Sequence, residues 1–188
     1  MRPALMVLAD DPAYGVPGLT DDPAVALRLL SATLDTVRQV AGVGRVLLVH
    51  PPDAESSLTP RALGFRLWPQ LGASPGERYA RAFQQGIDLG YEGSVVIGLN
   101  VPDLGAARIT EAVGLLEEHQ GVVIGDGDGG IGLLALQEPQ PTLFTGETVP
   151  AYSELCTRAS QQLVRLVELP PHHALTRDTL GAFAPSSA

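Results

Sequence analysis

The stretch VVIGLNVPDL, residues 95–104, decides the fold that this chain is expected to adopt. It begins as an apolar, β-branched run that stops at Gly98. A run of this length and composition, followed by turn-forming residues, is typical of a strand buried inside a sheet. Asn100 and Asp103 come directly after it, and open α/β sheets bind their ligands just beyond the carboxyl ends of parallel strands. The stretch therefore predicts both a central strand and a ligand site.

Strands and helices alternate on both sides of this stretch. Apolar runs predict strands at Ala4–Ala9, Arg45–His50, Phe65–Trp68, Ser94–Gly98, Gly121–Gly125, Ile131–Leu136 and Val164–Leu169. Helical spacing predicts helices at Pro23–Ala41, Glu77–Leu89, Ala106–His119, Thr148–Gln162 and Thr176–Phe183, with Pro51–Pro60 a polar loop and residues 183–188 a frayed tail. This alternation predicts a three-layer α/β/α sandwich with a mainly parallel sheet, formed by residues 1–188 as a single domain.

The composition excludes several classes of function. All 12 basic residues are arginines and the net charge is −9, so no basic stripe for nucleic acid is expected. Without lysine, the chain has neither a P-loop nor a Schiff-base mechanism. No apolar run approaches the roughly 18 residues of a membrane helix. The N-terminus reads as a strand rather than a signal peptide, so we expect a cytoplasmic protein without a membrane partner. Cys156 reads as a small buried hydrophobe.

The stretch GDGDGG, Gly125–Gly130, allows three interpretations. It matches the G-x-G-x-x-G pattern of dinucleotide-binding folds, but the following segment is strand-like and offers no helix N-terminus to a pyrophosphate. It also resembles the start of a calcium loop, but Gln137 stands where a bidentate Glu is needed. The third interpretation is a tight turn between two strands, since Asp-Gly favours positive φ.

The stretch GASPG, residues 72–76, matches the nucleophile elbow of serine hydrolases, with Ser74 as nucleophile and His172 or His173 as base. The oxyanion hole of these enzymes uses the backbone N–H of the residue after the serine, and Pro75 has none. The competing interpretation is a helix start, with Ser74 as N-cap and Pro75 at the first helical position. The two histidines, which follow two prolines, then belong to an exposed loop.

Polar side chains gather at the predicted strand ends. Asn100 and Asp103 follow one strand, and Asp128 can reach the same cleft from the next. Oxygen ligands at neighbouring strand ends suit a divalent cation that carries diphosphate oxygens. The structural alternative is that Asn100 and Asp103 only cap the helix that begins near Ala106.

Four stretches together resemble an uncharacterised bacterial family of the nucleotide-diphospho-sugar transferase superfamily, with a glycosyltransferase-A-like fold and kinship to the molybdenum-cofactor guanylyltransferases. They are PQLGASPGERYARAF (Pro69–Phe83), VVIGLNVPDL, VVIGDGDGGIGLLAL (Val122–Leu136) and PTLFTG (Pro141–Gly146). The resemblance implies that Asn100 and Asp103 handle a metal, Mg²⁺ or Mn²⁺, and the donor diphosphate. It further implies that Arg78, Gly129 and Gly130 bind the nucleotide, that Asp128 acts on the acceptor, and that no organic cofactor takes part.

The chain departs from the family pattern at several of these positions. Asn100 stands where the family has the Asp of Gly-Ser-Asp-x-Pro-x-Leu, and an amide oxygen brings no charge to a metal. The loop after the first strand has Asp10 and Leu19–Thr20–Asp21 where the family has basic residues, and Leu175 replaces an Asp before Thr176. These changes predict a weakened metal and nucleotide site.

Three hypotheses about function follow. The first is a glycosyltransferase or nucleotidyltransferase that uses an activated nucleotide or nucleotide-sugar, with Asp128 to orient or deprotonate the acceptor. The second is a catalytically degenerate member of the family, kept as a binding or assembly module. The third and most remote is a serine hydrolase that uses Ser74.

Overall fold

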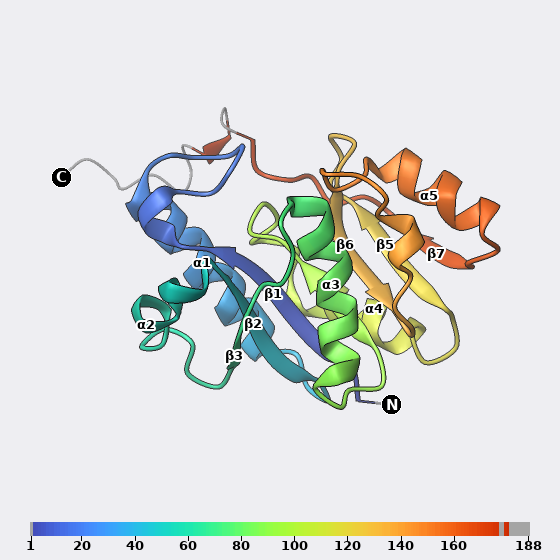
Figure 1. The fold of residues 1–188 in the computed structure, drawn as a ribbon, viewed down its shortest axis with the longest axis horizontal. Coiled ribbons are helices and arrows are strands. Elements are labelled where there is room, and N and C mark those ends of the chain that lie inside the picture. Colours follow the sequence, from blue (N-terminus) through green and yellow to red (C-terminus); the bar gives the residue numbers. More distant parts are fainter. Residues whose placement is uncertain (1, 177–178, 181–188) are drawn as a thin grey trace.

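The computed structural model describes residues 2–176 and 179–180, and within them a single sheet of seven strands runs through the molecule (Figure 1). The spatial order is β3-β2-β1-β4-β6-β5-β7. The strands are β1 (Ala4–Asp10), β2 (Gly44–His50), β3 (Arg66–Pro69), β4 (Ser94–Ile97), β5 (Gly121–Gly125), β6 (Ile131–Leu136) and β7 (Leu166–Leu169). All seven were predicted from apolar runs, with ends that differ by at most two residues.

The sheet is mainly parallel, as predicted. The pairs β1–β2, β1–β4, β2–β3 and β5–β7 are parallel, whereas β6 is antiparallel to both β4 and β5. The reason is the length of the connection, because a parallel crossover needs a dozen or more residues and only five separate β5 from β6. The carboxyl ends of β1, β2, β4 and β5 therefore meet at one edge, together with the start of β6.

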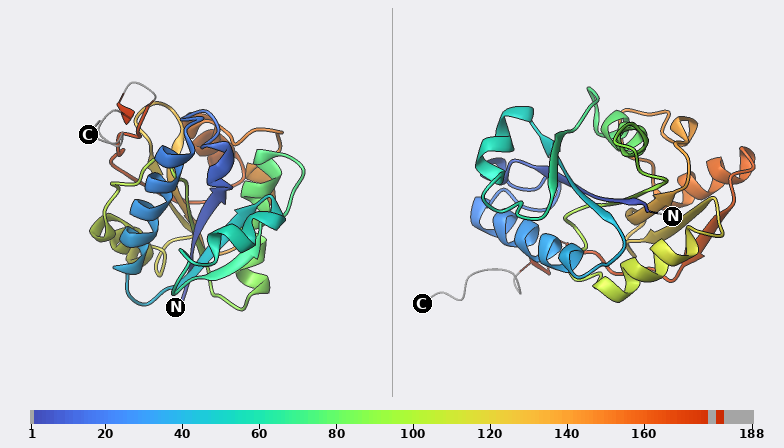
Figure 2. Two further views of the ribbon diagram at one scale, coloured as in Figure 1. Left: turned by 90° about the vertical axis from the view of Figure 1, so that its left-hand side faces the viewer. Right: turned by 90° about the horizontal axis from the view of Figure 1, so that it is seen from below.

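Five α-helices are present in the described part of the chain. They are α1 (Pro23–Arg38), α2 (Glu55–Leu58), α3 (Pro75–Asp88), α4 (Ala106–Leu115) and α5 (Tyr152–Gln161), with 3₁₀ turns η1 (Pro12–Tyr14), η2 (Pro52–Ala54) and η3 (Pro141–Leu143). The right-hand view of Figure 2 shows α1 and α4 on one side of the sheet and α3 and α5 on the other. The predicted three-layer α/β/α sandwich is confirmed.

Alternation along each strand divides the core between the two faces. In β1, Leu5 and Val7 belong to a cluster that includes residues of α1, α2 and α4. Ala4 and Met6 belong to a second cluster with residues of α3, α5 and η3. Because successive side chains of a strand point to opposite faces, a strand that is apolar at every position must be covered on both.

Several predicted elements differ in extent. The helix predicted to reach Ala41 ends at Arg38, and the helix predicted to reach His119 ends at Leu115. Pro51–Pro60 was expected to be a polar loop, but it contains η2 and α2, and Leu58 is buried in the core. The helix expected from Thr148 begins only at Tyr152, since Pro150 disfavours helical geometry in the residue before it. Residues 177–178 and 181–188 of the predicted C-terminal helix and tail lie outside the described residues. Among the helices described, none combines the length and the apolarity needed to cross a bilayer.

The predicted helix starts are confirmed by their caps. Asp22 Oδ1 accepts a hydrogen bond from the backbone N–H of Ala24 (2.8 Å), with Pro23 at the first position of α1. Ser74 Oγ accepts from the N–H of Glu77 (3.2 Å) at the start of α3. Ser74 is therefore a helix cap, and Pro75 supplies no donor to an oxyanion hole.

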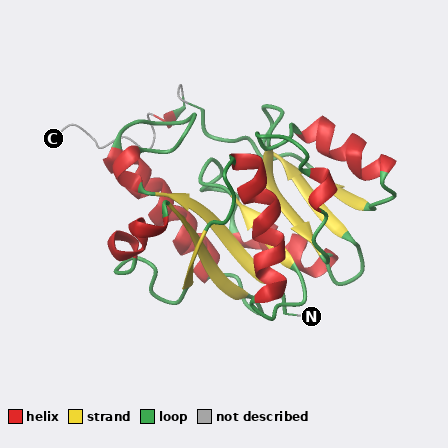
Figure 3. Cartoon of the chain, in the orientation of Figure 1, coloured by secondary structure: helices red, strands yellow, loops and turns green. Residues whose placement is uncertain are grey.

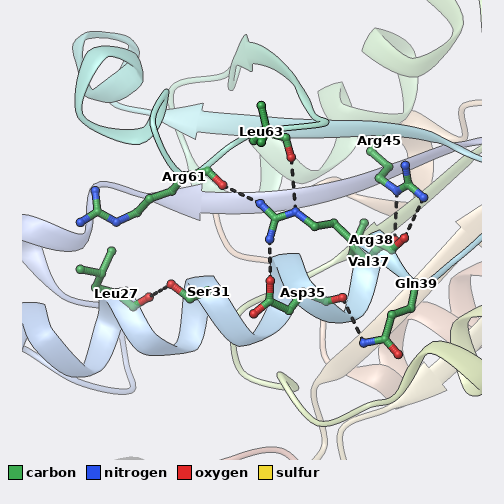
Figure 4. A network of polar contacts seen from close by, with 9 residues as sticks. All are labelled: Leu27, Ser31, Asp35, Val37, Arg38, Gln39, Arg45, Arg61 and Leu63. Carbon is green, nitrogen blue, oxygen red and sulfur yellow. Dashed lines mark hydrogen bonds and ion pairs between the residues drawn. The ribbon is translucent and has the colours of Figure 1, made fainter.

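Two arginines near the carboxyl end of α1 donate hydrogen bonds to backbone carbonyls (Figure 4). Arg45, from β2, donates to the carbonyls of Val37 (3.2 Å), Arg38 (2.8 Å) and Val40 (2.9 Å). Arg38 donates to Asp35 Oδ1 (2.6 Å) and to the carbonyls of Arg61 (2.7 Å) and Leu63 (3.3 Å). Cations that satisfy free carbonyls at a helix C-terminus also oppose its dipole, so α1 is held against β2 and against the segment before β3.

Candidate functional site

The loops at the carboxyl edge of the sheet enclose a cavity of about 470 Å³, called here the central cavity. Figure 3 shows these loops in green along the upper edge of the molecule. Tyr79, Ile131 and Val149 contribute apolar walls, and Asp10, Asn100 and Asp126 contribute polar groups. An apolar cavity of this size with a few convergent polar groups, beyond the ends of parallel strands, has the features of a small-molecule site.

A second cavity of about 410 Å³, the strap cavity, lies beside the first. One wall is the strap, residues 170–176, which follows β7 and runs along the carboxyl edge of the sheet (Figure 1). Its backbone is tied to the strand ends by His172 N to Gly125 O (2.9 Å), Ala174 N to Asp126 O (2.7 Å) and Leu175 N to Asn100 O (2.9 Å). The strap cavity and the central cavity have a common wall, which is formed by Val16, Pro17, Leu99, Asn100 and Asp126.

The GDGDGG stretch is the tight turn that joins β5 to β6, and this interpretation of it is confirmed. Asp126 Oδ1 accepts from the N–H groups of Asp128 (3.0 Å) and Gly130 (2.7 Å), and the N–H of Asp126 donates to the carbonyl of Gly130 (3.0 Å). Gly127 and Gly129 have φ of 82° and 94°, which a side chain would strain. The turn carries Asp128 on its exposed side and Asp126 on its buried side.

The structure brings some of the predicted site residues together. Asn100 and Asp128 both line the strap cavity, and Asn100 also lines the central one. Gly130 lines the central cavity. Gly129 and Gly130 line a smaller space of about 220 Å³ beside Tyr152, whose N–H donates to the carbonyl of Gly129 (2.8 Å). The roles of these residues stay predictions.

Asp103 and Arg78 lie apart from this group. Asp103 Oδ1 is 3.0 Å from His172 Nε2, and Asp103 is not among the residues that line either cavity. The histidine thus has an acidic partner 69 positions away, which spacing along the sequence did not reveal. Arg78 lies in α3 outside both linings, but close enough to Asp10 for its charge to act on that carboxyl.

Asp10 is a perturbed carboxyl group in the lining of the central cavity. Burial at the end of β1 raises the pKa of its carboxyl above the ordinary value, and the charges of Arg78 and His50 offset part of this rise. Burial disfavours the ionised form because it removes water from the charge. The charges of Arg78 and His50 do not fully compensate for the lost hydration, so the ionised form of Asp10 lowers the stability of the folded state.

Asp10→Asn is therefore expected to raise the melting temperature at pH 7 by about 2–4 °C. The stability that a carboxyl with a raised pKa contributes is complete below its unfolded-state pKa and is lost as the pH rises through the folded-state value. The gain should accordingly shrink towards pH 4. Thermal unfolding across this pH range measures it. Asp53→Asn, at an exposed position of η2, removes the same charge; an equal gain in that variant would contradict the explanation by burial.

Asn100 is the one predicted metal ligand in the described linings of the two cavities. Among the described residues, no three His, Cys, Asp or Glu side chains gather as a metal site. The side-chain amide of Asn100 lines both cavities, and amide and carboxylate oxygens are the ligands of Mg²⁺ and Mn²⁺. Mg²⁺ typically binds through one or two protein oxygens plus phosphates and water, so Asn100 is sufficient only with a phosphate ligand present.

Sequence reasoning missed two residues of the site. Asp126 was considered only within the three interpretations of the GDGDGG stretch, and Tyr79 was not singled out. The local pattern Asp-x-Asp-Gly-Gly identifies Asp126 as an acceptor for backbone N–H groups two and four residues on, which is a signal in the sequence. For Tyr79 there is no such signal, because its place in the cavity wall depends on where α3 packs.

The amino-acid sequence matches one family model. Residues 33–149 match the family described as "Uncharacterized protein conserved in bacteria (DUF2064)". No curated protein matches the chain significantly.

Solved structures of the same fold are more numerous. A protein from Desulfovibrio desulfuricans G20, provisionally named a nucleotide-diphospho-sugar transferase, is 18% identical with a TM-score of 0.77, over 92% of this chain and 81% of that one. 4-Diphosphocytidyl-2C-methyl-D-erythritol synthase from Anaerococcus prevotii DSM 20548 is 9% identical with a TM-score of 0.65, over 97% and 94%. CMP:2-keto-3-deoxy-manno-octonic acid synthetase, solved with CTP, is 10% identical with a TM-score of 0.59, over 93% and 91%. At these identities the similarity establishes the fold.

Proposed function

We propose that this chain, which belongs to the bacterial family DUF2064, binds an activated nucleotide, such as a nucleotide-sugar, in the central cavity and transfers the sugar or the nucleotidyl group. The observation that carries this proposal is the common wall of the two cavities, whose polar side chains are those of Asn100 and Asp126. A transferase must hold two substrates side by side, and a donor in one cavity faces an acceptor in the other across this wall. The synthetase of the same fold that was solved with CTP supports a nucleotide as donor.

The central cavity suits the base and the ribose. Its walls are mostly apolar, and Gly98 and Gly130 let the backbone approach a ligand closely. Backbone N–H and C=O groups together with a few side-chain oxygens give a base orientation and specificity. Gly129 and Gly130 act in this way as nucleotide-binding residues.

The diphosphate requires positive charge that the cavity walls do not provide. Among the described lining residues of the two cavities there is no arginine, lysine or histidine. A Mg²⁺ or Mn²⁺ ion, when bound, neutralises phosphate oxygens. Asn100 would ligate this ion, more weakly than a carboxylate would. Asp103 would become a second ligand if its contact with His172 were broken. Arg78 contacts a phosphate at the rim, near Asp10. Asp128 orients or deprotonates the acceptor in the strap cavity.

Nucleotides and metals are expected to stabilise the protein together. A nucleotide at about 100 times its Kd adds about 2.7 kcal/mol to the free energy of unfolding, which raises the melting temperature of a chain of this size by about 5–10 °C. The shift should depend on Mn²⁺ or Mg²⁺, because the walls lack cations. Thermal unfolding with CTP, GTP, UTP and UDP-glucose, with and without each metal, measures it.

Asn100→Asp sharpens this experiment, because the variant restores a carboxylate without changing the shape of the side chain. It should bind Mn²⁺ in the presence of nucleotide about tenfold more tightly or better. Gln161→Glu, at an exposed position of α5, adds the same charge away from the cavities and should leave Mn²⁺ binding unchanged. If no nucleotide shifts the melting temperature with any metal, the proposed function is wrong.

A second candidate is a degenerate family member that binds a ligand without transferring a group. The place of Asp10 in the lining of the central cavity favours it, since an ionised carboxyl repels phosphates. Turnover of a nucleotide-sugar that Asp128→Ala abolishes would exclude this candidate.

A further inference from the structure

The two ends of the sheet differ in whether a further strand can pair with them. At the β3 end, the N–H of Gln70 donates to the carbonyl of Val49 (2.8 Å), so the backbone groups of Leu67 and Pro69 face away from β2. Pro69 has no N–H, and its carbonyl already accepts from Nε2 of Gln85 (2.8 Å). This end of the sheet is therefore closed except at one residue.

The other end of the sheet, β7, is open (Figure 1). The N–H of Arg165 donates to Oε1 of Gln120 on the β5 side (2.8 Å). Because backbone groups alternate along a strand, those of Val167 face β5, and those of Leu166 and Glu168 face away from the sheet. Among residues 2–176 and 179–180, no other segment bonds to the backbone of these last two residues. Two N–H and two C=O groups remain for a further strand.

The open run is short and symmetric. On one side, the N–H of Val164 donates to the carbonyl of Ala159 (2.9 Å). On the other side, Pro170 has no N–H, and its carbonyl accepts from Nη2 of Arg108 (2.6 Å). The four outward groups between these limits lie in equal numbers before and after Val167.

We infer that β7 pairs antiparallel with β7 of a second copy of this chain, about a twofold axis at Val167. Leu166 then exchanges two backbone hydrogen bonds with Glu168 of the partner subunit, and the reverse pair adds two more. A register shifted by two residues would oppose one of these residues to Val164 or Pro170, whose N–H groups are occupied or missing. The run is thus complementary to itself, as a twofold interface requires, and the closed β3 end stops the assembly at two copies.

The charge at this end of the sheet fits a second copy. Residues 152–169 contain two arginines and two glutamates, so this segment is neutral in a chain with a net charge of −9. Two copies can therefore approach here with little like-charge repulsion. The carboxylate of Glu168 accepts from the hydroxyl of Tyr152 (2.6 Å), which turns its charge towards α5. It does not protect the edge against pairing, as charged side chains on edge strands often do.

Leu163 provides an apolar contact beside the paired strands. It directly follows the C-cap of α5, has φ of 60° and is 84% exposed. A left-handed backbone at this position favours glycine, and exposure of a leucine side chain to water is also unfavourable. In the register centred on Val167, Leu163 lies opposite Pro171 of the partner subunit, and Pro171 is itself exposed. Each of these apolar side chains would cover the other.

Sedimentation velocity and NMR of the full chain test the inference. The paired segments have four residues each, which is less than a standard interface, so we expect a dimer with a Kd of about 10–100 µM. Sedimentation between about 1 and 300 µM brackets this value. Over the same range, the ¹H–¹⁵N signals of Leu166 and Glu168 should shift with concentration, and that of Leu67 should not.

A pair of charge variants tests the register. Val167 faces its own copy across the axis, so Val167→Lys and Val167→Glu each oppose two like charges and should weaken self-association about tenfold or more. An equimolar mixture of the two variants should pair again, since Lys then opposes Glu. Leu67→Lys is the matched control. Leu67 and Val167 are both partly buried against the same core cluster, but Leu67 lies at the closed end, and its variant should dimerise like the wild type.

Leu163→Gly tests the apolar contact in a variant that is expected to fold. It removes the side chain and relieves the left-handed backbone, so dimerisation should weaken about threefold or more without a lower melting temperature. The inference is overturned if the chain stays monomeric up to about 300 µM, which would leave β7 to an extended segment of another protein.

It is also overturned if the chain associates without a shift at Leu166 and Glu168, or if the mixed charge variants stay monomeric. Should the charge variants fail to fold, NMR of the wild-type chain and Leu163→Gly still decide. No nucleotide or metal is needed in these experiments. Their outcome is therefore independent of the test of the proposed function.

Discussion

Phe83→Ala is expected to lower the free energy of unfolding by about 3–5 kcal/mol, the usual cost of deleting a buried aromatic ring. Phe83 lies in α3 and is 1% exposed. Its ring is stacked on Phe144 at a centroid distance of 5.8 Å and tilted against Tyr79 at 6.0 Å. Removal of the ring leaves a cavity in the cluster that holds α3 and η3 on the sheet. Urea denaturation measures the loss as a lower midpoint at unchanged slope.

Phe65→Ala is the matched control for this variant. Phe65 is only partly buried, at the rim of the other cluster, with the guanidinium of Arg38 5.4 Å from its ring centroid. Its loss should cost less than half as much, because less apolar area leaves water on folding. If both variants lose the same stability, α3 is not packed as described, and the position of Tyr79 in the cavity wall is also in doubt.

Gly15→Ala is expected to weaken nucleotide binding strongly by disrupting a wall of the central cavity. Gly15 has φ of 82°, and a Cβ there would lie 2.1 Å from the carbonyl oxygen of Thr20. That oxygen accepts the hydrogen bond from Val16 N (2.7 Å), which forms an isolated β-bridge between Val16 and Thr20. The added methyl group therefore cannot be accommodated while this bridge is intact. Val16 and Pro17 line both cavities. The affinity for the best nucleotide should fall by about a hundredfold or more.

Gly18→Ala provides an unusually close control. Gly18 belongs to the same loop and has φ of 78°, but a Cβ there meets nothing within 4 Å. This variant should lose only the stability that left-handed backbone costs a residue with a side chain, about 1–2 kcal/mol. It should bind nucleotide like the wild type. Calorimetric titration of both variants measures the difference, and equal losses would show that backbone strain matters, rather than the contact with Thr20.

Much of the fold could be predicted because its signals are local. The strands are apolar runs bounded by turn formers, and Asp22–Pro23 and Ser74–Pro75 mark helix starts through side chains that bond the nearest backbone groups. The Asp126–Gly130 turn is local in the same way. The helix within Pro51–Pro60 was missed because its signal is not local. A helix of one turn, such as α2, is too short to show hydrophobic periodicity, and it forms because Leu58 packs into the core.

The site was only partly predictable. The position of Asn100 and Asp128 at strand ends follows from the α/β pattern, and both line the strap cavity. The contact between Asp103 and His172 could not be foreseen, because it joins residues that are 69 positions apart. The strap itself has no periodic pattern, and its three backbone hydrogen bonds to strand ends depend on the path of the chain after β7.

By itself, the sequence determined that this chain forms a helix-flanked sheet with polar groups at the strand ends, because hydrophobic period, caps and turns act over a few residues. The tertiary structure alone decided that β6 pairs with both β4 and β5, that Asp103 lies 3.0 Å from His172, and that the strap is hydrogen-bonded to the strand ends. These features depend on distances between segments far apart in the chain, and such distances are set only when the two faces of the sheet are packed.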